Sequence, residues 1–125
     1  MVKFGTLEYY KKWAETINRD EQVSKSGLSA TVLNVFEDLK TPEGMEKAFF
    51  MKYEDGKVTE VREARPDEEA EFVTRTTYSM FAGIAKGEVD PQQAKPKYSL
   101  MKALRHMGTW KRIQEIAKEM KDVEY

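Results

Sequence analysis

The side chains with the clearest chemical use in this sequence are apolar, and they gather in the stretch TTYSMFAGIAKGEVDPQQA at residues 76–94. Met80, Phe81 and Ile84 recur there at a spacing that places them on one face of a helix. Gly83 would let this helix approach the sheet closely. Methionine is flexible and polarizable, so this face suits either an ordinary core or the wall of a pocket for an apolar ligand.

Residues for acid–base, nucleophilic or metal chemistry are scarce. The chain has no cysteine, which excludes a disulfide, a thiol nucleophile and a thiolate metal site. Its one histidine, His106, cannot form a two-histidine metal site, and we can assign it no acidic partner. The acidic runs DEEAE and EDGK are typical of turns and of the solvent-facing side of a strand. We therefore predict no catalytic residue and no metal ion.

Length and charge indicate one globular domain that spans residues 1–125. Hydrophobic residues make up 40% of the chain and charged residues 34%, with a formal net charge of −1. Lys and Arg are balanced by Asp and Glu along the chain, which argues against nucleic-acid binding. The sequence has no signal-peptide pattern and no apolar run near the about 18 residues that indicate a membrane span. We expect a soluble, cytoplasmic protein.

Helices are predicted at both ends of the chain, with strands between them. Apolar residues at helical spacing place Trp13 and Trp110 on the stripes of the terminal helices, so both should be largely buried. Asp55-Gly56 predicts a two-residue hairpin turn. The segment KYSLMKALRH is interpreted as a fifth strand, although its Leu and Met content also suits a helix. The predicted fold class is α+β, with a mostly antiparallel five-stranded sheet and helices packed on it. The expected order is helix 7–18, strands 29–39, 47–54, 57–63 and 69–75, helix 77–87, strand 98–105 and helix 109–121.

The segment KGEVDPQQA, residues 86–94, resembles a motif of a known family. Asp90 is a favoured N-cap, and Pro91 suits the first position of the short helix that follows. The hairpin EDGKV, the later RPD and the MG before the last helix fall in the same order and spacing. Together these motifs make residues 7–120 resemble the sterol carrier protein type-two family of lipid-binding domains.

The resemblance implies a lipid-binding function. A five-stranded sheet and its helices would enclose an apolar tunnel that carries a sterol, a fatty acid or another acyl chain. This implies no catalysis, no metal and no organic cofactor. We hypothesise that the ligand is bound by eight residues that line the cavity: Phe36, Phe50, Met80, Phe81, Ile84, Met101, Met107 and Trp110.

Other functions stay open beside lipid carriage. The same cavity could hold the substrate of a small enzyme, or the chain could be an accessory domain of one. Asn34 and Asp38 are then candidate inward-facing polar residues, because they share a strand face with Phe36. The chain could instead be an interaction module that forms a homodimer. Transient contact with a membrane is a further expectation for a lipid carrier.

Overall fold

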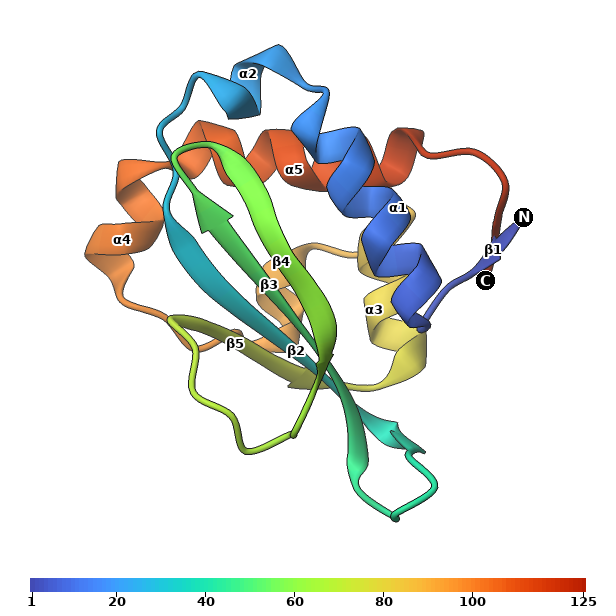
Figure 1. Ribbon diagram of the computed structural model, residues 1–125. Helices are drawn as coiled ribbons and strands as arrows, with labels where there is room; N and C mark the ends of the chain where they lie inside the picture. The colour runs from blue at the N-terminus through green and yellow to red at the C-terminus, as the bar shows by residue number, and fades with distance from the viewer.

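The computed structural model describes the whole chain, residues 1–125, and Figure 1 shows its helices and strands. One four-stranded sheet is combined with helices, and the two chain ends lie side by side at the edge of the molecule. No helix is both long and apolar enough to cross a bilayer. The elements are β1 (Val2–Lys3), α1 (Leu7–Asn18), α2 (Glu21–Ser24), β2 (Ala30–Lys40), β3 (Glu46–Glu54), β4 (Lys57–Ala64), β5 (Phe72–Thr76), α3 (Tyr78–Ala85), η1 (Pro91–Ala94), α4 (Leu100–Arg105), α5 (Met107–Glu119) and β6 (Val123–Glu124).

The main sheet has the strand order β4-β3-β2-β5. β4, β3 and β2 are antiparallel neighbours, whereas β5 runs parallel to β2, with Leu33 opposite Val73. The α+β class is confirmed, but the expectation of five mostly antiparallel strands is wrong. After β4 the chain crosses the sheet and adds β5 at the far edge of β2, so β5 enters in the direction of β2. The terminal strands β1 and β6, which the sequence did not reveal, form a separate parallel pair.

The hairpin between β3 and β4 is confirmed at Asp55-Gly56. Both residues have positive φ, 48° and 83°, which is the backbone of a primed two-residue turn. The N–H of Gly56 donates to the carbonyl oxygen of Leu28 at 2.8 Å, and the N–H of Asp55 donates to Ser29 Oγ at 3.0 Å. The turn is therefore attached to the segment that leads into β2.

The predicted fifth strand at 98–105 is wrong, because this segment forms helix α4. A single antiparallel bridge between Lys97 and Val73 is all that adds to the sheet there. Residues 98–105 contain no β-branched side chain, whereas Leu, Met, Lys, Ala and Arg are good helix formers. His106, with φ −128° and ψ 35°, separates α4 from α5.

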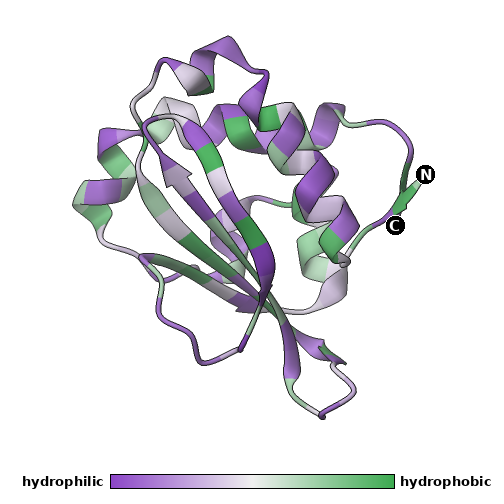
Figure 2. Cartoon of the chain, in the orientation of Figure 1, coloured by the Kyte–Doolittle hydropathy of each residue, from purple (hydrophilic) through white to green (hydrophobic).

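Helices α1, α3 and α5 cover one face of the sheet and enclose the main core. Alternate residues of each strand face these helices, and Phe36 and Phe49 from this face are fully buried. A smaller cluster that includes Leu33 and Phe50 occupies the opposite face, where Ala70 packs against it from the connection between β4 and β5. Figure 2 shows the hydrophobic residues along the strands and on the inner sides of the helices.

Two sequence-based details of α3 are settled by its surroundings. Thr77 is its N-cap and accepts a hydrogen bond from the N–H of Met80, as expected. Gly83 permits a close approach, but to Val89 and not to the sheet. A Cβ at Gly83 would lie 2.7 Å from Val89 Cγ2. The chain after α3 therefore folds back tightly on the helix, which positions η1 beside the sheet.

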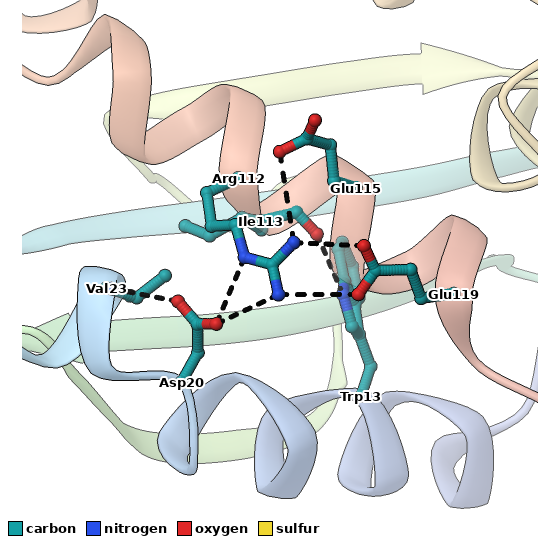
Figure 3. A network of polar contacts seen from close by, with 7 residues as sticks. All are labelled: Trp13, Asp20, Val23, Arg112, Ile113, Glu115 and Glu119. Carbon is teal, nitrogen blue, oxygen red and sulfur yellow. Dashed lines mark hydrogen bonds and ion pairs between the residues drawn. The ribbon is translucent and has the colours of Figure 1, made fainter.

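Arg112 of α5 connects this helix to the junction of α1 and α2 (Figure 3). Its Nε and Nη2 each lie 3.0 Å from Asp20 Oδ1, and its Nη1 lies 3.0 Å from Glu119 Oε2. The other Asp20 oxygen accepts a hydrogen bond from the N–H of Val23, which caps α2. Burial alone would raise the pKa of Asp20, but the hydrogen bonds from Arg112 and Val23 outweigh it and hold that pKa below its ordinary value.

Candidate functional site

A pocket of about 460 Å³ lies between the helix-facing side of the sheet and the helices α4 and α5. Twelve of its 19 lining residues are hydrophobic, so it is suited to an apolar ligand. The sheet forms its floor, because alternation along each strand turns one side chain in two toward the helices. These floor residues are Val32, Met51, Tyr53, Phe72 and Thr74.

Helices α4 and α5 form the outer wall of the pocket. Leu100, Ala103, Leu104 and Met107 follow one another at helical spacing and all line it. Leu100 and Leu104 are nevertheless 64% and 50% exposed, so the wall that they form is also the mouth of the pocket. Trp110, one turn further along α5, lies deeper and packs against Phe72 with ring centroids 4.7 Å apart.

A smaller hollow of about 80 Å³ extends the pocket toward α1 and α3. The two spaces share six lining residues, among them Trp13, Asn34 and Thr74. Asn34 Nδ2 donates a hydrogen bond to Tyr10 Oη at 3.2 Å, so its amide is held in place at the junction. The pocket is therefore apolar at its floor and wall and has a polar collar at its inner end.

Four of the eight residues hypothesised to bind the ligand line these spaces. Met107 and Trp110 line the larger pocket, and Phe81 and Ile84 line the smaller hollow. Trp110 is only partly buried, and Trp13 is 8% exposed, as expected for a core residue. The structure thus brings the C-terminal helix and α3 to the same space but at different ends of it.

The other four hypothesised residues lie outside the lining. Phe36 is fully buried against Phe81, with ring centroids 4.4 Å apart, and belongs to the core. Phe50 points to the opposite face of the sheet, where the guanidinium carbon of Arg62 lies 4.3 Å from its ring centroid. Met80 is half-buried on α3, and Met101 is 69% exposed on α4.

The floor residues of β3 were missed by the sequence analysis, although a signal for them exists. Met51 and Tyr53 alternate with Phe50, so that choosing Phe50 selected the wrong face of the strand for this pocket. Which face the helices cover depends on residues that are distant in the sequence. Leu100 and Leu104 were missed because their segment was interpreted as a strand.

The pocket holds few groups for acid–base chemistry. None of its lining residues is a carboxylate or a histidine, and Lys111 is the one charged residue among them. Burial raises the pKa of Tyr53 above its ordinary value, so its hydroxyl stays neutral in the physiological range. Trp110 Nε1 is buried without a hydrogen-bond partner. Asp38, a candidate for an inward carboxylate, is exposed and accepts a hydrogen bond from the N–H of Tyr78 at 2.8 Å.

Solved structures share this arrangement over most of the chain. The crystal structure of sterol carrier protein 2 matches with a TM-score of 0.75, covering 92% of this chain and 97% of that chain at 13% identity. The chain has the sterol carrier protein 2 fold. A conserved hypothetical protein from Thermus thermophilus has the same sterol carrier fold, with a TM-score of 0.73, 13% identity and coverage of 91% of this chain and 87% of that chain.

The sterol carrier fold also occurs inside a larger enzyme. A stereoselective inverting sec-alkylsulfatase from Pseudomonas sp. matches with a TM-score of 0.56 and 19% identity, covering 81% of this chain but 15% of that chain. No protein-family model matches the sequence, and no curated protein matches it either. The likeness is therefore one of fold.

Proposed function

We propose that this chain binds and carries an apolar or amphipathic small molecule, such as a fatty acid or a sterol, without converting it. The observation that carries this proposal is the apolar pocket between the sheet, α4 and α5. Its volume of about 460 Å³ falls within the about 300–1,000 Å³ range of small-molecule sites. The sterol carrier fold supports the same function, and we propose that the protein performs it in the cytoplasm.

The arrangement of charge favours a single acyl chain with an anionic head group as the ligand. Lys111 is the one charged side chain in the lining, and it is exposed. A carboxylate at the mouth could pair with its ammonium group while the chain lies on the apolar floor. A neutral sterol would gain nothing from this lysine.

The area that such a ligand buries predicts modest affinity. Burial of roughly 400 Å² of apolar ligand surface at about 25 cal/mol per Å² contributes about 10 kcal/mol. Association costs on the order of 4–15 kcal/mol, which offsets most of that gain. We expect a dissociation constant around micromolar and weak selection among chain lengths.

A matched pair of alanine replacements tests the pocket. Ala103 of α4 is half-buried and lines the pocket, whereas Ala14 of α1 is 5% exposed in the packed core. Ala103→Phe should fill the pocket, keep the stability of the protein and abolish binding of a fluorescent fatty-acid probe. Ala14→Phe should overpack the core and cost about 1–3 kcal/mol of stability.

Mass spectrometry of an organic extract from the purified protein would identify a co-purifying ligand. Retention of probe binding by a folded Ala103→Phe variant, or no binding by the parent protein, would contradict the proposed function.

A further inference from the structure

Helix α4 presents an exposed apolar surface at the mouth of the pocket. No residue of α4 is buried, and Figure 2 shows hydrophobic and hydrophilic residues following one another along it at the edge of the molecule. Apart from the two terminal residues of the chain, all of its exposed large hydrophobic side chains are here. They are Leu100, Met101, Leu104 and Met107, with exposed fractions of 64%, 69%, 50% and 61%.

The segment around α4 is also strongly basic. Residues 91–114 hold six of the 21 Lys and Arg residues of the chain and none of its 22 Asp and Glu residues. The balance of charge that holds for the whole sequence therefore fails in this segment. Lys102 is paired with Glu71, and Arg112 with Asp20. The four remaining cations are exposed and form no ion pair: Lys95, Lys97, Arg105 and Lys111.

We propose that α4 and its flanking cations form a docking surface for an anionic lipid bilayer. Exposed Leu and Met side chains can enter the interface between head groups and acyl chains, and unpaired Lys and Arg are attracted to anionic head groups. This set has both properties together, as membrane-surface helices do. Since Leu100 and Leu104 also line the pocket, docking would bring the pocket mouth to the bilayer, where an apolar ligand could move without crossing water.

Charge argues against a second copy of the chain as the occupant of this surface. A two-fold contact through α4 would place the four unpaired cations of one copy opposite those of the other. Nucleic acid would be attracted to the cations but would leave the four exposed Leu and Met side chains in water. An anionic bilayer is complementary to both the charge and the apolar side chains.

Vesicle co-sedimentation tests the docking surface. The parent protein should bind vesicles of phosphatidylcholine and phosphatidylglycerol in equal parts and bind vesicles of phosphatidylcholine alone far more weakly. Lys97→Gln with Arg105→Gln should weaken binding about 25-fold, from about fivefold for each cation near an anionic surface. The matched control is Lys11→Gln with Arg19→Gln on α1 and its C-cap, where both side chains are exposed and form no ion pair. It removes the same charge and should bind nearly as the parent does.

A label at Met101 tests insertion directly. The chain has no cysteine, so Met101→Cys can carry one environment-sensitive dye, and Lys118→Cys gives an exposed control on α5. The dye at 101 should shift to the blue with anionic vesicles, and the dye at 118 should not. Met101→Gln, which changes no lining residue of the pocket, should weaken vesicle binding about tenfold.

These readouts are independent of ligand carriage, because the fatty-acid probe measures the pocket without vesicles. Loss of vesicle binding by the α4 variants with probe binding unchanged supports the docking surface. Equal loss in the α1 control, no preference for anionic vesicles, or an unshifted dye at position 101 would overturn it. A concentration-dependent dimer that Met101→Gln abolishes, in a protein that does not bind vesicles, would overturn it in favour of a contact between copies.

Discussion

The two tryptophans have different surroundings although both lie on terminal helices. Trp13 Nε1 donates a buried hydrogen bond to the carbonyl oxygen of Ile113 at 3.3 Å, as Figure 3 shows. Trp110 is only partly buried, and its Nε1 has no partner. Trp13 therefore contributes to stability through packing and a hydrogen bond, whereas Trp110 keeps a desolvated donor beside the pocket.

Replacement of each tryptophan by phenylalanine should separate these two roles. Trp13→Phe removes the hydrogen bond and should cost about 1–2 kcal/mol of unfolding free energy. Trp110→Phe removes a donor that has no partner, so its loss should be clearly smaller. Urea denaturation followed by circular dichroism measures both. Equal losses would show that the Trp110 donor is satisfied in solution.

Lys111 should matter for the head group of a ligand more than for its chain. Lys111→Gln should weaken binding of a fatty acid about two- to tenfold, as expected for a solvent-exposed ion pair. Binding of the fatty alcohol with the same chain should change little. Competition against the fluorescent probe measures both affinities. An equal effect on acid and alcohol would assign Lys111 a purely structural role.

At the scale of elements, the contact of α5 with the α1–α2 junction depends on one carboxylate. Asp20→Asn keeps an N-cap of similar quality but removes the charge that Arg112 binds. The side chains of Asp20 and Arg112 are 14% and 24% exposed, and we expect a loss of about 1–3 kcal/mol at neutral pH.

The effect of Asp20→Asn should depend on pH with a defined sign. The pKa of Asp20 is lower in the folded protein than in the unfolded chain, so its stabilisation is complete above the unfolded value of about 3.9. It is lost as the pH falls through the folded value. The difference between parent and variant should therefore persist above about pH 5 and close in stronger acid. A gap that stays constant down to acid unfolding would contradict this assignment.

The β3–β4 hairpin provides a second test at the element scale. Gly56→Ala places a methyl group 2.4 Å from the carbonyl oxygen of Ser24, in a backbone with φ 83°. Gly44 has a similar φ of 87° but nothing within 4 Å of an added Cβ, so Gly44→Ala isolates the strain of the backbone alone. We expect a loss of about 1–2 kcal/mol for Gly44→Ala and a distinctly larger one for Gly56→Ala. Similar losses in chemical denaturation would mean that α2 moves away freely.

For the whole molecule, stability should be lowest at the outer wall of the pocket. α4 has no buried residue, whereas α5 buries Thr109, Ile113, Ile116 and Ala117. Hydrogen exchange should therefore be fast in α4 and slow in α5 and in β2, because local opening costs little where few apolar contacts are lost. A saturating fatty acid should slow exchange in α4 most. Protection of α4 equal to that of α5 in the free protein would contradict the description of α4 as a loosely held wall.

The sequence alone determined those elements whose signals are local. The N-caps Thr6 and Thr77 and the turn at Asp55-Gly56 depend on a few neighbouring residues, and all three appear where the residue types predict them. The resemblance that starts from KGEVDPQQA correctly indicated the sterol carrier fold. The helix at 100–105 also had a local signal, in its Leu and Met content, which the search for a fifth strand overrode.

Only the tertiary structure decided which faces meet and in which direction strands pair. Alternation along β3 separates Phe50 from Met51 and Tyr53, but it does not say which set the helices will cover. That choice, and with it the pocket floor, follows from α1, α4 and α5 packing on one side of the sheet. The parallel entry of β5 likewise depends on the open edge of β2. The partners in these contacts lie tens of residues apart in the chain, so no window of local sequence contains them.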